Sequence, residues 1–237
     1  MSISFASAGP NTYTTLAVGP DFRHELAIKR SRFITVLRRV EDDAQARALV
    51  AELRREFYDA RHHCSAFVIG ADRSIQRSND DGEPSGTAGI PMLEALVKRE
   101  TRSSDAPAGR PAADLSDVCV VVVRYFGGIL LGAGGLVRAY SESVSAALEQ
   151  APLVRRERLK LFEVAVPHAE AGRLENDLRT AGYAMAGNSY DAVNTRVGIA
   201  MADDSATIAA AVERLASLTA GRCTLTPAGT DWVDTAY

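Results

Sequence analysis

One uninterrupted apolar run constrains the fold of this chain more than any other feature. The sequence VCVVVVRYFGG, residues 118–128, opens with five valines around one cysteine. A continuous run of β-branched residues at strand length is typical of a central strand that is buried on both faces. Such a strand needs apolar layers above and below its sheet. The composition supplies them, because 46% of the 237 residues are hydrophobic and 24% are charged.

Further strands and helices are expected around this run. Strands are indicated by β-branched content, and helices by apolar residues at helical spacing. We expect strands at 32–40, 62–69 and 74–78, and helices at 43–57, 91–99 and 135–150. Residues 101–116 are rich in Pro, Gly and Ala and predict a surface loop. Residues 1–20 are expected to form a flexible tail.

The chain after Ala151-Pro152 shows a separate succession of predicted strands and helices. Strands are predicted at 158–166, 183–190, 193–201 and 223–226, with helices at 174–181 and 208–218. The resulting order β-α-β-β-α-β is the split β-α-β pattern of ferredoxin-like domains. The sequence therefore predicts an α+β fold with one domain at 21–152 and a second at 153–237.

Charge and cysteine usage exclude several classes of protein. With 27 basic and 30 acidic residues the net charge is −3, which argues against coating nucleic acid by bulk charge. Three cysteines lie far apart without a CxxC motif, as expected in a reducing compartment. No apolar run approaches the ~18 residues of a membrane span, and the first twenty residues lack Lys and Arg. We expect a cytoplasmic protein that does not contact membranes.

The segment DDGEPSGTAG, residues 80–89, has two interpretations. Carboxylates at this spacing can hold Mg²⁺, and backbone N–H groups before a helix can receive an anion. The alternative is a tight loop with solvated acids, in which Ser85 or Thr87 caps the helix. The candidate ligand-binding residues of this segment are Asp80, Asp81, Gly82, Glu83, Gly86, Thr87 and Gly89.

A second segment, residues 124–140, carries five glycines within nine residues between the buried strand and a helix. Glycine lets the backbone approach a ligand closely, and an arginine at each end can clamp a phosphate or carboxylate. Neither GxxxxGK[ST] nor GxGxxG occurs. The alternative is close packing of helix on strand. The candidates here are Arg124, Tyr125, Gly127, Gly128, Gly132, Gly134, Gly135 and Arg138.

Two weaker signals complete the set. His62 precedes another histidine and a cysteine, but no second cluster supplies the remaining ligands of a zinc site. No metal or cofactor is therefore expected. A basic run can touch RNA phosphates or form a solvated linker face. Its RNA-contact candidates are Arg155, Arg156, Arg158 and Lys160.

The two glycine-rich segments, DDGEPSGTAGIP and VVVRYFGGILLGAGGLVRAY, together resemble the IMPACT/YigZ family in its bacterial two-domain form. The strands KRSRFI and ARHHCSA, residues 29–34 and 60–66, look like two further pieces of that family. The resemblance covers about residues 20–150. It implies a first domain similar to domain 2 of ribosomal protein S5. It also implies a ferredoxin-like second domain similar to the fifth domain of elongation factor G.

The resemblance leaves two functional hypotheses. Eukaryotic members regulate translation, RNA or ribosome binding is suggested for bacterial members, and no catalytic residue can be transferred. The first hypothesis is therefore a non-enzymatic, translation-associated regulator that binds RNA, the ribosome or a protein partner. The second is a phosphate-ligand or Mg-nucleotide binding protein or enzyme, with His62 as the candidate general base. Convergence of both glycine-rich segments on one pocket favours the second.

Overall fold

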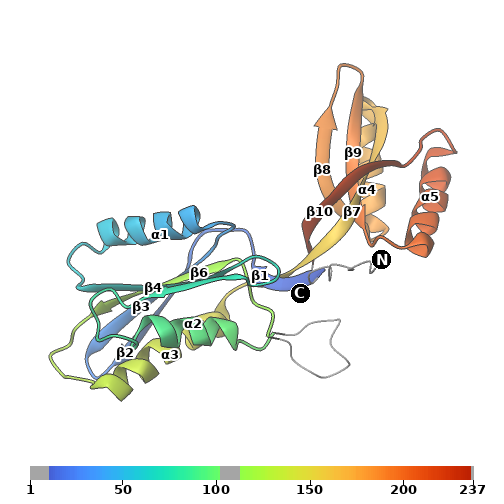
Figure 1. Cartoon of the computed structure of the whole chain (residues 1–237). Helices are drawn as coiled ribbons and strands as arrows, with labels where there is room; N and C mark the ends of the chain where they lie inside the picture. Colours follow the sequence, from blue (N-terminus) through green and yellow to red (C-terminus); the bar gives the residue numbers. More distant parts are fainter. Residues whose placement is uncertain (1–10, 102–112, 236–237) are drawn as a thin grey trace, which may run out of the picture. The chain divides into compact units, whose positions relative to one another are not determined.

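The computed structural model describes residues 11–101 and 113–235. They form two compact units that divide between Arg155 and Arg156, shortly after the predicted boundary at Ala151-Pro152. Helices pack on a β-sheet in each unit, so the fold is mixed α and β (Figure 1). No helix in the described ranges combines the length and the apolar character that a membrane span requires.

The first unit is built on a five-stranded sheet. Its elements are β2 (Phe22–Ile28), β3 (Ser31–Arg39), α1 (Asp43–Glu56), β4 (His62–Ile69), β5 (Ile75–Asn79), α2 (Gly89–Val97), β6 (Val118–Tyr125) and α3 (Ala133–Gln150). The strand order is β2-β3-β6-β4-β5, and every neighbouring pair is antiparallel. Helix α1 covers one face of this sheet, and α2 and α3 cover the other (Figure 1).

Strand β6 occupies the centre of this sheet and confirms the prediction of a strand buried on both faces. Val118, Val120 and Val122 join the core under α2 and α3. The alternate side chains, beginning with Cys119, join the core under α1. Because side chains alternate along a strand, two helical layers require both sets to be apolar. The uninterrupted run of valines is the result.

Strand β1 (Thr12–Leu16) lies where the sequence predicts part of a flexible tail. The prediction is wrong for this strand, while residues 1–10 lie outside the described residues. Tyr13 and Leu16 are each only 3% exposed. The hydroxyl of Tyr13 donates to Asp117, 104 residues further along the chain, and the Ser116 N–H donates to the Thr14 carbonyl at 2.9 Å. These distant partners order a segment whose own five residues carry little signal.

The second unit contains β7 (Leu153–Pro167), α4 (His168–Thr180), β8 (Ala184–Tyr190), β9 (Asn194–Met201), α5 (Ser205–Thr219) and β10 (Thr226–Thr235). Its strands follow the order β10-β7-β9-β8. Strand β7 starts in the first unit, and β1 pairs with it. Both helices pack their apolar residues on β7 and β9, with Leu178, Ile199 and Leu215 each 1% exposed.

Some element boundaries differ from the sequence expectation. Strand β2 was not predicted, although its half-buried and exposed residues alternate strictly. The last strand was expected at 223–226 but runs over Thr226–Thr235, so residues 223–225 are not part of it. Of the loop expected at 101–116, residues 102–112 lie outside the described residues.

Candidate functional site

Asp80 holds the acidic loop, residues 80–89, against the start of helix α2. Its Oδ1 accepts the N–H groups of Ala88 at 3.0 Å and Gly89 at 2.7 Å, and its Oδ2 accepts that of Gly86 at 2.8 Å. Burial opposes the charged form of Asp80, but these three donors outweigh it and hold the pKa below its ordinary value. The N–H groups expected to receive a ligand anion are therefore satisfied by the chain's own carboxylate.

The capping interpretation of this loop also requires correction. Helix α2 has no side-chain cap from its N-cap residue Ala88. The Thr87 hydroxyl instead donates to the carbonyl of Pro84 at 2.6 Å. Asp80 therefore supplies the acceptor that the sequence assigned to Ser85 or Thr87.

The three acidic side chains of the loop point to different partners. Asp81 pairs with Arg54 at 2.5 Å and accepts the backbone N–H of His63 at 2.6 Å. Asp80 is engaged by the loop, and Glu83 is buried elsewhere. Among the residues that the structure describes, no group of three His, Cys, Asp or Glu side chains is placed to hold a metal ion. The hypothesis that the three carboxylates hold Mg²⁺ is wrong.

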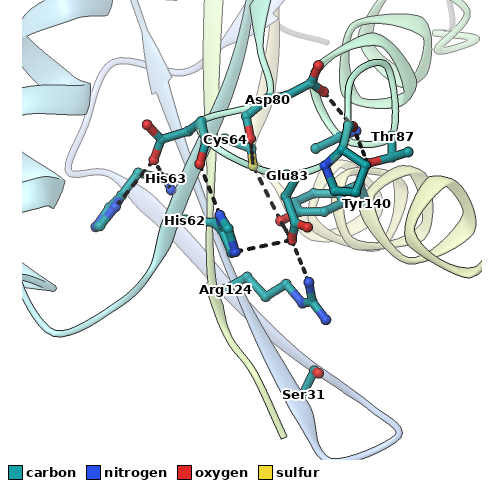
Figure 2. Close-up of polar contacts among 12 residues, drawn as sticks. Ser31, His62, His63, Cys64, Asp80, Glu83, Thr87, Arg124 and Tyr140 are labelled. Atoms are coloured by element: carbon teal, nitrogen blue, oxygen red, sulfur yellow. Dashed lines mark hydrogen bonds and ion pairs between the residues drawn. The ribbon is translucent and has the colours of Figure 1, made fainter. Parts of the chain in front are cut away.

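Glu83 and Arg124 form a buried ion pair between the acidic loop and the end of β6 (Figure 2). Their side chains are 4% and 6% exposed, and Arg124 Nη1 lies 2.5 Å from Glu83 Oε1. The Tyr140 hydroxyl donates to the same carboxylate oxygen at 2.8 Å. The Arg124 guanidinium lies 5.5 Å from the ring centre of Phe33 and 5.7 Å from that of Phe126. Packing from several sides thus fixes this cation in one orientation.

His62 is oriented by the backbone of the acidic loop (Figure 2). Its Nδ1 lies 3.0 Å from the carbonyl oxygen of Asp81. A carbonyl only accepts, so Nδ1 carries a hydrogen. Nε2 lies 3.9 Å from Glu83 Oε1. The imidazole therefore presents Nε2 beside the buried ion pair.

Two neighbours of this network were missed as site residues by sequence reasoning. The Tyr140 hydroxyl lies 3.3 Å from Cys64 Sγ, which donates to the carbonyl of Asp80 at 3.0 Å. Burial raises the pKa of Cys64 to about 12, and burial also raises that of Tyr140. Both groups stay protonated and act as hydrogen-bond donors rather than nucleophiles. Tyr140 sits on the apolar face of its helix, so its spacing indicated core packing and nothing more.

The glycine-rich turn, residues 126–132, connects β6 to α3. It contains one tightly packed glycine and ends at a helix start whose N-cap residue provides no side-chain cap. A Cβ at Gly127 would lie 2.1 Å from the carbonyl carbon of Arg30, so no larger residue fits there. The Gly127 N–H donates to Ser31 Oγ at 3.2 Å. Gly132 has φ +70° and precedes α3 without a side-chain cap. The first N–H groups of an 18-residue helix therefore face this end of the turn with their partial positive charge.

A cavity of about 340 Å³ lies where the acidic loop and the glycine-rich turn meet. Its polar lining includes the imidazole of His62 and the Glu83–Arg124 pair, and its wall continues into the start of α3. The lining residues are Arg61, His62, Glu83, Pro84, Arg124, Phe126, Leu130, Leu131, Gly132, Ala133 and Leu136. The two segments singled out in the sequence thus share one concave site.

Other predicted site residues lie outside this cavity. The side chain of Tyr125 packs on the α1 side of the sheet and donates to Asp59 at 2.7 Å. Arg138 is exposed on α3. The remaining candidates shape the loop, the turn and the helix starts. They are Asp80, Asp81, Gly82, Gly86, Thr87, Gly89, Gly127, Gly128, Gly134 and Gly135.

The RNA-contact candidates lie on β7 in different environments. Arg155 is buried. Arg156 lies 3.8 Å from Asp234, and Lys160 pairs with Asp203 at 2.9 Å. Arg158 is exposed, whereas Arg156 and Lys160 are half-buried. That these four residues contact RNA stays a prediction, and acidic neighbours offset the charge of Arg156 and Lys160.

Comparison with known proteins places this site in a defined class of domain. Residues 29–106 and 108–148 match the family model of the Impact N-terminal domain, and these ranges contain every lining residue of the cavity. The cavity therefore belongs to an Impact-type N-terminal domain. The chain belongs to the IMPACT family.

Curated relatives carry the same family name. The chain is 44% identical over 160 residues to IMPACT family member YvyE of Bacillus subtilis (strain 168), covering 68% of this chain and 67% of that protein. It is 41% identical over 150 residues to IMPACT family member YigZ of Escherichia coli (strain K12), covering 62% and 67%. A crystal structure of a hypothetical protein matches at 33% identity with a TM-score of 0.56, covering 92% of this chain and 97% of that one.

Proposed function

We propose that the first unit binds a small organic anion in the cavity between the acidic loop and the glycine-rich turn. One observation carries the proposal: His62, Arg124 and the uncapped start of α3 all line one cavity. Arg124 Nε is buried and has no hydrogen-bond partner among the described residues. Glu83 neutralises part of the Arg124 charge and also keeps the guanidinium in place. A phosphate or carboxylate would supply the missing acceptors.

The rest of the lining indicates what the anion is attached to. Phe126 and Leu130 are 45% and 85% exposed, and Leu131 and Leu136 complete an apolar wall. Ligand sites combine such walls with a few polar groups that fix orientation. The proposed ligand therefore carries an apolar or aromatic group beside its phosphate or carboxylate, as a nucleoside monophosphate does.

A thermal-shift experiment tests this proposal. The full chain is heated with inorganic phosphate, a nucleoside monophosphate or a sugar phosphate, each with and without Mg²⁺. A ligand at a hundred times its Kd adds about 2.7 kcal/mol to the stability of the unit that binds it. We expect the nucleoside monophosphate to raise the melting temperature most, with no requirement for Mg²⁺.

Matched variants locate the binding. Leu130→Asp places a carboxylate on the wall of the cavity, whereas Val18→Asp places one at a position that is 81% exposed and does not line it. We expect the first variant to lose the thermal shift and the second to keep it. Equal shifts in both variants, or no shift with any of the probes, would contradict the proposal.

A translation-associated role is a second proposal, supported by family membership and by the exposed Arg158 on β7. Here the protein is a non-enzymatic cytoplasmic regulator that contacts RNA or the ribosome. The free cysteines Cys64, Cys119 and Cys223 fit that compartment. Sedimentation of tagged protein with ribosomes, lost after RNase treatment, supports this role. Sedimentation that Arg158→Ser leaves unchanged argues against this residue as the contact.

The fold relationships are proposed with it. The order β10-β7-β9-β8 and the succession β-α-β-β-α-β support a ferredoxin-like second unit, similar to the fifth domain of elongation factor G. The helix-covered sheet of the first unit supports a likeness to domain 2 of ribosomal protein S5.

A further inference from the structure

A second concave surface lies on the other side of the sheet, between α1 and strands β4 and β5. It encloses about 640 Å³. We call it the arginine groove, after Arg47, Arg54 and Arg55 of α1 and Arg77 of β5. None of its lining residues belongs to the cavity described above. Its occupant is therefore a separate question from the proposed small anion.

The arginine groove gathers basic side chains in a chain whose net charge is −3. Four arginines line it, and Asp43 is its only acidic lining residue. Asp43 is shared, since it lies 2.5 Å from Arg47 and 4.0 Å from Arg77. The side chains of Arg47 and Arg77 are 72% and 68% exposed. The groove therefore has more cationic than anionic groups, and a partner can reach them.

The helix arranges these charges along one line. Residues seven apart fall on the same face after about two turns, so Arg47 and Arg54 are about 10 Å apart along α1. Arg54 is already paired with Asp81 at 2.5 Å, at the end of the groove nearest the acidic loop. An elongated anionic segment, rather than a single compact anion, matches this spacing.

The floor of the arginine groove is apolar at its centre. Val50 is half-buried, and Phe67 is 8% exposed at the base. An apolar centre with an arginine rim is the arrangement typical of protein–protein contact surfaces. Single-stranded nucleic acid needs exposed aromatic faces on which bases can stack, and the buried Phe67 does not offer one. The floor thus favours a peptide over RNA.

Strand β5 adds a backbone edge beside the groove. It ends the strand order of its sheet, and all five of its residues are exposed. Within the described part of the chain, no strand pairs with its outer edge. A segment lying along β5 would form backbone hydrogen bonds and place every second side chain on the α1 face.

We propose that the arginine groove binds an extended acidic segment of a partner protein, which pairs with the outer edge of β5 and turns acidic and apolar side chains toward α1. Both acidic and apolar residues of that segment occupy the alternate positions that face α1. The acidic side chains meet the arginines of α1 and β5, and the apolar ones face the floor of the groove. The proposal does not depend on the small-anion site.

A labelled peptide tests the proposal by fluorescence anisotropy on the full chain. The probe is about eight residues long, enough to pair with all of β5, and has Glu and Val at its odd positions and Ser at its even positions, so that Glu and Val share one face. The comparison probes are the same peptide with Gln for Glu and an oligouridine of similar length. We expect the Glu peptide to bind at least about tenfold more tightly than the Gln peptide, with affinity falling as salt is added.

Matched double variants connect binding to the groove. Arg47→Gln with Arg77→Gln removes two groove cations, and Arg173→Gln with Arg179→Gln removes two exposed cations of α4 that also have acidic neighbours. Melting temperatures of both variants verify that they fold. We expect about tenfold weaker binding of the Glu peptide in the first variant only.

Three results would overturn the proposal. They are absence of Glu-peptide binding to the wild-type chain, equal affinity in both double variants, and tighter binding of oligouridine that is lost in the groove variant. The last result would assign the arginine groove to RNA instead.

Discussion

Replacement of Asp80 by Asn tests how the acidic loop is held against α2. The two carboxylate oxygens accept three backbone N–H groups, two at Oδ1 and one at Oδ2. Asn has one accepting oxygen. If it takes the place of Oδ1, the bonds from Ala88 and Gly89 survive, and the NH₂ group then faces the N–H of Gly86. Asp80→Asn therefore removes one charge-assisted bond and places two donors together.

The cost follows from the strength of that bond. Hydrogen bonds to charged groups contribute about 1.5–3 kcal/mol, and an orphaned donor adds to the loss. Asp80 is half-buried, so water relieves part of the penalty. We expect the free energy of unfolding of the first unit to fall by about 2 kcal/mol. With a urea m-value of about 2 kcal/mol per M, the midpoint falls by about 1 M.

Urea denaturation followed by circular dichroism, together with amide hydrogen exchange, measures this effect. Asp204→Asn is the matched control, because Asp204 is the N-cap of α5 and accepts the N–H of Thr207 at 2.8 Å. Asn caps helices as well as Asp, so the control should be nearly neutral. Exchange should accelerate at Gly86 in the Asp80 variant. If Asp80→Asn costs no more than Asp204→Asn, the three-bond account of the loop is incorrect.

Two further predictions concern the same unit. Gly127→Ala should destabilise the first unit severely, because the added Cβ would lie 2.1 Å from the backbone of Arg30. The added Cβ of Gly134→Ala meets nothing within 4 Å, so this variant should be neutral or stabilising. Comparison of the two melting temperatures checks this prediction. Burial lowers the pKa of His63 from its ordinary 6.5, so the unfolded chain takes up a proton first on acidification. The free energy of unfolding should therefore fall as the pH drops below about 6.5. Measured between pH 7.5 and 5.5, His63→Gln should show a smaller fall than the wild-type chain. An unchanged pH dependence would show that His63 is not responsible.

The sequence predicted those helices and strands whose apolar residues form a local pattern along the chain. The run at 118–128 indicated a strand buried on both sides, and β6 is that strand. The helix expected at 135–150 begins only two residues earlier, at Ala133. Strand β1 escaped prediction because its order depends on partners about a hundred residues away. The five residues of β1 do not by themselves indicate these partners.

The site shows the same division. The sequence by itself identified the two glycine-rich segments and His62, because clustered glycines and carboxylates are visible without a fold. Only the tertiary structure decided what each carboxylate does. Asp80 closes its own loop, Asp81 pairs with Arg54, and Glu83 turns inward to Arg124. The sequence shows which charged residues are close along the chain. Their partners come from distant strands and helices, which only the folded structure brings beside them.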